Sequence, residues 1–233
     1  MFIPFRTMAN LPPQLLARLG AEQARNLQEI VDIIGEELAA VCEANRKEHR
    51  EARGDNAHTY GTNNYHHLRF RLDGRLEDDA RGSVVHWKNA YKISVGPITL
   101  GIYALGSYGE DSINESFPDD SATKRDYGNH NRDQLSLFEV DLASPLPAEA
   151  AYSLDELIVG HFSNPREGLT KWYVGAYVID DEGRHSWAWH ERQDEAGEGF
   201  APPPKRDPIV PFSAGEVESL EVRPRRDRAE RAE

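Results

Sequence analysis

The stretch ARNLQEIVDIIGEELAAV, residues 24–41, determines the first half of the predicted fold. Its apolar side chains recur at alternating steps of three and four residues, which places them on one face of an α-helix. This apolar stripe consists of Ala24, Leu27, Val31, Ile34, Leu38 and Val41. The helical pattern extends over residues 15–54, so the sequence predicts a long amphipathic helix that follows an N-terminal arm over residues 1–14.

The apolar stripe has two interpretations. It packs against a sheet of its own chain, or it forms a coiled-coil seam with a second copy of the chain. The second interpretation rests on Leu27, Ile34 and Val41, which are seven residues apart, as coiled-coil packing requires. It would make residues 24–41 a self-association surface and the protein a homo-oligomeric structural component.

After Asn56 the apolar pattern changes from a helical repeat to alternation, which is typical of strands. A first strand is predicted over residues 65–72, with His66, Leu68 and Phe70 on one face. Further strands are predicted over residues 84–95, 98–105, 135–142, 171–179 and 186–191. We therefore predict an α+β fold, in which the long helix precedes a mainly antiparallel sheet of five to seven strands within a β-rich body over residues 60–191.

Two long segments lie outside these elements. Residues 106–133 form a predicted acidic loop, and a loop of that length is usually either functional or disordered. Residues 192–233 form a predicted tail that is rich in proline and charged residues and is partly disordered.

The net charge of −13 limits the partners that this chain can bind. An acidic balance argues against binding to nucleic acid or to an anionic membrane surface, and it permits a basic partner or a bound cation. The sequence contains neither an apolar run long enough to span a membrane nor a signal-peptide pattern, so we expect a cytoplasmic protein. The preference for arginine over lysine suggests a bacterial or phage origin.

The sequence lacks the motifs of the common enzyme classes: a P-loop, a dinucleotide-binding glycine motif, a serine-nucleophile elbow and a zinc-protease helix. We predict no cofactor. The candidate metal ligands are His66, His67, Asp119 and His130. Only one of His66 and His67 could join a given site, because neighbouring residues on a strand point to opposite faces. A metal-dependent hydrolase that uses such His and Asp ligands is one alternative function.

Aromatic residues are concentrated on the last two predicted strands, which form a hairpin. Trp187 and Trp189 are two residues apart and are predicted to share a face, with Trp172 and Tyr173 on the preceding strand. These side chains either pack in the core or form an exposed binding surface, with Arg166 and Lys171 beside it. The leading prediction is a non-enzymatic protein-binding or accessory protein that engages a protein partner through this aromatic sheet face and the acidic loop.

Overall fold

The computed structural model describes residues 11–87, 90–106, 113, 122–136, 148–179, 183 and 185–194. The chain divides into two units, residues 1–201 and residues 202–233, and all described residues belong to the first. Most of the predicted arm and tail, and much of the predicted acidic loop, lie outside the described residues.

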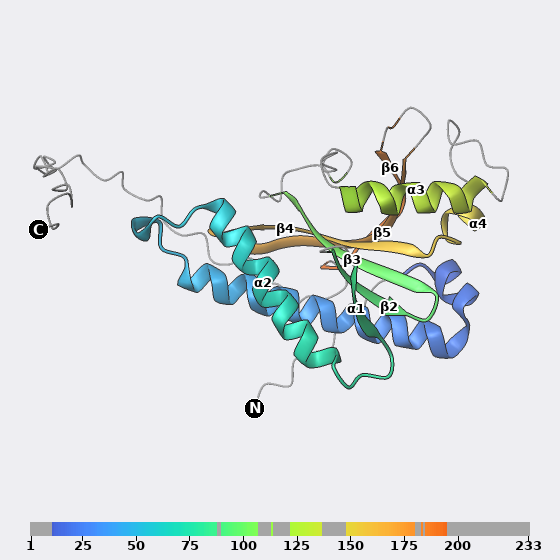
Figure 1. Ribbon diagram of the computed structural model, residues 1–233, viewed down its shortest axis with the longest axis horizontal. Coiled ribbons are helices and arrows are strands. Elements are labelled where there is room, and N and C mark those ends of the chain that lie inside the picture. The colour runs from blue at the N-terminus through green and yellow to red at the C-terminus, as the bar shows by residue number, and fades with distance from the viewer. Residues whose placement is uncertain are drawn as a thin grey trace, which may run out of the picture. The chain divides into compact units, whose positions relative to one another are not determined.

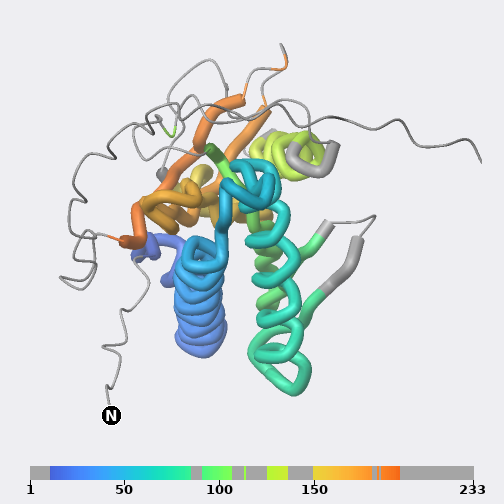
Figure 2. The backbone as a smooth tube through the Cα atoms, turned by 90° about the vertical axis from the view of Figure 1, so that its left-hand side faces the viewer, coloured from blue at the N-terminus to red at the C-terminus, as the bar shows by residue number. Residues whose placement is uncertain are grey.

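Two helices, α1 (Pro13–Glu48) and α2 (Ala57–Leu76), lie side by side on one face of a sheet, as Figure 2 shows. A short 3₁₀ turn, Glu51–Arg53, connects them. The apolar stripe of α1 packs against the strands of its own chain. Its buried members are Leu27, Val31, Ile34, Leu38 and Val41. The stripe therefore contributes to the core of this chain, as the first of the two interpretations expects.

The predicted strand over residues 65–72 is wrong, because these residues belong to α2. The buried side chains of α2 repeat every four residues, which is a helical spacing, and they are Tyr60, Asn64, Leu68, Leu72 and Leu76. The apparent alternation depended on Phe70, whose side chain is 79% exposed. Asn56 caps α2 by accepting hydrogen bonds from the backbone N–H groups of His58 and Thr59. The change from helix to strand therefore comes after Leu76.

The sheet has six strands in the order β1-β2-β3-β4-β5-β6. They are β1 (Ser83–Trp87), β2 (Ala90–Val95), β3 (Ile98–Gly106), β4 (Glu156–Asn164), β5 (Gly168–Ile179) and β6 (His185–Arg192). Neighbouring strands are antiparallel except for β3 and β4, which are parallel. The predicted α+β class, with a long N-terminal helix and a mainly antiparallel sheet, is confirmed.

A helical crossover joins the parallel strands β3 and β4. It contains α3 (Ala122–Ser136) and the short helix α4 (Ala148–Ala151). Helix α3 lies on the opposite face of the sheet from α1, as Figure 1 shows, so the sheet is covered by helices on both faces. Part of the predicted loop over residues 106–133 is thus helical. Of the predicted strand over residues 135–142, the first two residues belong to α3 and the rest lie outside the described residues.

Helix α1 approaches the sheet closely at Gly35. A Cβ atom at this position would lie 2.5 Å from Cζ2 of Trp172, a buried side chain of β5. We expect Gly35→Ala to destabilise the fold by about 1 to 2 kcal/mol, because the clash outweighs the better helix propensity of alanine.

Gly61→Ala in α2 is the matched control, since nothing lies within 4 Å of a Cβ atom there. This substitution should stabilise the fold by about 0.5 to 1 kcal/mol. Urea denaturation of both variants measures the difference in free energy of unfolding. Equal stability of the two variants would contradict the close contact between α1 and Trp172.

Candidate functional site

A β-bulge in β6 separates the two tryptophans that were predicted to share a face. Trp189 pairs with Ala176 and Trp187 pairs with the next residue, Tyr177, so Ala188 is an extra residue in β6. The two indoles therefore lie on opposite faces of the sheet, and the prediction of a common face is wrong.

The aromatic residues of the hairpin are mostly buried. Trp172 and Trp189 belong to the core cluster that includes α1, and each is less than a tenth exposed. Tyr173 is buried on the other face, next to Phe162. Trp187 is partly buried on that face and its indole N–H donates to the carbonyl of Ile113 at 3.1 Å. These four side chains do not form one exposed surface.

The two basic residues predicted beside this surface are more accessible. Arg166 is exposed and follows Asn164, whose Oδ1 accepts a hydrogen bond from the Arg166 backbone N–H at 2.9 Å. Lys171 is partly exposed in β5, where its backbone pairs with Phe162. The burial of the neighbouring aromatic side chains leaves these two residues without the predicted aromatic surface.

The candidate metal ligands do not converge in the described part of the chain. His66 and His67 both lie on α2, where His66 packs against Tyr65 and Nδ1 of His67 lies 2.8 Å from Oδ1 of Asn45. His130 is exposed on α3, and Asp119 lies outside the described residues. Among the described residues, no group of three or more His, Cys, Asp or Glu side chains could hold a metal ion.

A buried polar network joins α1, α2 and β4. The amide of Asn45 donates to Oδ1 of Asn64 at 2.7 Å, and the amide of Asn64 donates to the hydroxyl of Ser163 at 3.4 Å. The Tyr60 hydroxyl donates to the backbone carbonyl of Cys42 at 2.9 Å. Burial raises the pKa of the Cys42 thiol to about 11, which keeps it protonated and unreactive at neutral pH. We therefore interpret this network as structural.

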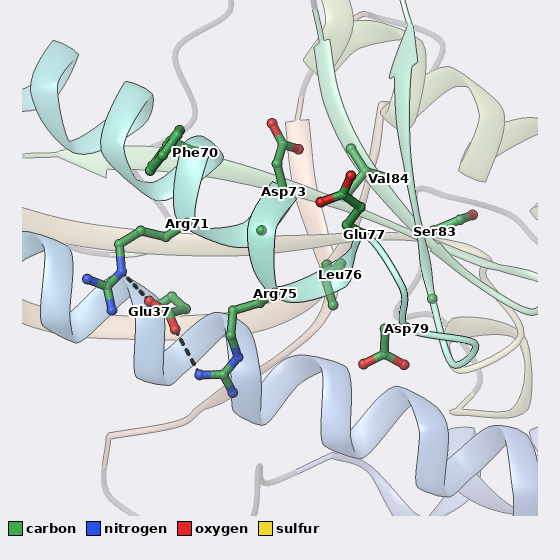
Figure 3. A pocket seen from close by; sticks show the side chains of 12 residues that line it. Glu37, Phe70, Arg71, Asp73, Arg75, Leu76, Glu77, Asp79, Ser83 and Val84 are labelled. Atoms are coloured by element: carbon green, nitrogen blue, oxygen red, sulfur yellow. Dashed lines mark hydrogen bonds and ion pairs between the residues drawn. The ribbon is translucent and has the colours of Figure 1, made fainter.

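A cleft of about 1010 Å³ lies between α1, the C-terminal half of α2 and the edge strand β1. Figure 3 shows the side chains that line it. They include Glu37 from α1, Phe70, Asp73 and Glu77 from the region of α2, and Ser83 and Val84 from β1.

Two guanidinium groups hold the buried carboxylate of the cleft. Glu37 is 4% exposed, and Nη1 of Arg75 donates to its Oε1 at 3.0 Å while Nε of Arg71 donates to its Oε2. Arg75 also forms an ion pair with Glu36 at 3.4 Å. These ion pairs connect α1 to α2, and they occupy both basic side chains of the cleft in contacts within the chain.

Two other carboxylates line the cleft. Asp73 and Glu77 are one helical turn apart, and the Asp73 carboxylate lies beside the Tyr91 hydroxyl. Burial raises the pKa of the Tyr91 hydroxyl, and the nearby Asp73 carboxylate raises it further. The cleft therefore combines an excess of carboxylates over guanidinium groups in its lining with the exposed ring of Phe70. Sequence reasoning missed this site because it placed Phe70 on a strand.

Comparison of the chain with protein-family models, curated proteins and solved structures gave no match. Within the described residues, no helix has the length and apolar character needed to cross a membrane.

Proposed function

We propose that this chain is a non-enzymatic binding protein whose protein partner docks in the cleft between α2 and β1. The observation that carries this proposal is the 79% exposure of Phe70, a large apolar ring at the cleft. Aromatic and arginine side chains are enriched in protein interfaces and dominate their binding energy. Phe70 lines the cleft together with Val84 of β1, so a partner would meet apolar side chains there, whereas Arg71 is already paired with Glu37.

The chemistry of the cleft also favours binding over catalysis. An enzyme site usually contains an acid, base or nucleophile whose pKa is shifted by its surroundings. Here His161, with a pKa lowered to about 4 by burial, and Cys42 are both buried side chains that do not line the cleft. Asp79 does line it, and the hydrogen bond from Arg81 lowers the pKa of its carboxyl group, which keeps this group ionised. Glu37 lines the cleft, but its carboxylate is already engaged by two arginines.

Phe70→Ala is expected to weaken partner binding by about 10- to 100-fold, because an aromatic anchor at the centre of an interface contributes much of its affinity. The same substitution should change the free energy of unfolding by less than about 0.5 kcal/mol, because the ring is on the surface. The partner is first identified with a photo-crosslinking amino acid at position 70, in extracts of the source cells. Affinity is then measured with the purified partner by calorimetry.

The matched crosslinking control is position 62, since Thr62 is exposed on the same helix and lies outside the cleft. A discrete crosslinked product from position 70 and none from position 62 is the expected result. Equal affinity of the wild type and Phe70→Ala for the partner would disprove the proposed interface.

A further inference from the structure

We infer that the partner enters the cleft as an extended basic segment that pairs with the edge of β1, adding a seventh strand to the sheet. This inference rests on the proposed function, because it specifies the kind of partner that the same cleft accepts. Three observations carry it: the position of β1 at the sheet edge, the exposure of that edge in the cleft, and the charge of the facing side chains.

Strand β1 is a terminal strand of the sheet, and within the described residues it pairs with β2 alone. An edge strand directs the N–H and C=O groups of alternate residues away from its neighbour, where they can pair with another extended chain. Gly82, Ser83 and Val84 line the cleft, so the start of β1 is accessible from it. The cleft thus offers hydrogen bonds to a backbone as well as contacts to side chains.

The charge of the cleft selects a basic segment. Its lining contains the four carboxylates of Glu37, Asp73, Glu77 and Asp79 but only the two guanidinium groups of Arg71 and Arg75. Both guanidinium groups are paired with Glu37, and Asp79 is paired with Arg81. The lining thus has two more carboxylates than guanidinium groups, an excess that favours lysine or arginine side chains, and the net charge of −13 would speed the approach of a basic partner.

The carboxylates of the cleft and the edge of β1 could contact the same added segment. Glu77 and Val84 both line the cleft, as Figure 3 shows, so the carboxylate and the strand that would receive the segment face the same space. Alternate side chains of an added strand point to the same side, so basic residues at every second position would face α2. Phe70 would contact the apolar parts of the same segment.

The test uses labelled synthetic peptides and the full chain. The first peptide alternates lysine and valine, the second replaces each lysine with glutamate, and the third is the lysine peptide N-methylated on alternate backbone nitrogens. The lysine peptide should bind and shift the amide resonances of Ser83 and Val84. The glutamate peptide should not bind, and N-methylation should weaken binding at least about tenfold because it removes backbone donors.

The contribution of the cleft carboxylates is tested with the double variant Asp73→Asn and Glu77→Gln. This variant should bind the lysine peptide at least about tenfold more weakly than the wild type does. The control, Glu22→Gln with Glu48→Gln, removes the same charge from exposed positions of α1 outside the cleft and should bind as the wild type does. Equal weakening in both double variants would show that net charge alone attracts the peptide, which would overturn the inference.

Other results would also overturn it. These are equal binding of the N-methylated peptide, equal binding of the glutamate peptide, or no binding of the lysine peptide at about 1 mM. Light scattering could instead reveal a homodimer whose interface maps to β1. The edge of β1 would then bind a second copy of this chain and not a basic segment of a partner. The crosslinking experiment at position 70 does not depend on these peptides. A partner captured there whose binding requires Phe70 would sustain the proposed function even if the peptide results excluded strand pairing.

Discussion

Asn131→Asp is expected to destabilise the fold by about 3 kcal/mol or more, because it leaves two buried carbonyl groups without donors. Asn131 is fully buried on α3. Its amide donates to the backbone carbonyls of Glu156 at 2.9 Å and Tyr177 at 2.8 Å. These carbonyls belong to β4 and β5, beyond Ile158 and Gly175, the last pair between these two strands. The Asn131 side chain therefore bridges β4 and β5 where their own pairing has ended.

Aspartate has the same shape as asparagine but no amide donor, and its carboxylate would face two carbonyl oxygens. The control is Asn63→Asp, the same chemical change at an exposed position of α2, which should alter stability by less than about 0.5 kcal/mol. Chemical denaturation of both variants measures the effect. A loss below about 1 kcal/mol for Asn131→Asp would show that water or other groups satisfy these carbonyls.

Lowering the pH from about 7 to 4.5 is expected to reduce the free energy of unfolding by about 2 to 3 kcal/mol because of His161 alone. His161 is 6% exposed on β4, opposite Trp172 of β5, and burial lowers its pKa to about 4. Its Nδ1 atom has no hydrogen-bond partner among the described residues. The imidazole is therefore neutral in the folded protein over most of this range.

The sign follows from proton binding in the two states. An unfolded histidine takes up a proton below a pKa of about 6.5, whereas the folded one does not until about pH 4, so protons favour unfolding in this window. The stability that depends on neutral His161 is full above pH 6.5 and declines as the pH falls towards 4.

His161→Gln removes the titration, so its free energy of unfolding should fall less than that of the wild type over this pH range. The difference between their slopes isolates His161 from other groups, including Glu156, whose pKa burial raises. The same histidine-to-glutamine change at position 66, on the exposed face of α2, controls for the substitution itself. Identical slopes for the wild type and His161→Gln would mean that the imidazole is hydrated in the folded protein.

The parts of the fold that the sequence predicted have strong and continuous patterns. The apolar stripe of α1 predicted the first helix because six apolar residues keep one helical spacing. The hairpin of β5 and β6 was predicted because long apolar strands flank a turn of Asp, Glu and Gly residues. Helix α2 was missed because Asn64 occupies its buried face and Phe70 its exposed face, which is the reverse of the usual pattern.

The candidate site depended on features that no local pattern records. The β-bulge that separates Trp187 from Trp189 adds one residue to β6, and nothing in the sequence marks where it occurs. The cleft combines α1, α2 and β1, and the excess of carboxylates in its lining appears only once these three elements are placed together. Its one sequence signal was an aromatic residue among three arginines, Arg69, Arg71 and Arg75.

Because of the extra residue in β6, the tryptophans of the hairpin lie on both sides of the sheet, and their fluorescence can report on each side separately. Trp187 senses the side of the sheet that α3 covers, whereas Trp172 and Trp189 sense the side that α1 covers. Chains that lack Trp87 and keep only one of these three indoles would each emit from one side of the sheet. Their fluorescence during denaturation would reveal whether the two layers separate in a single event or one after the other.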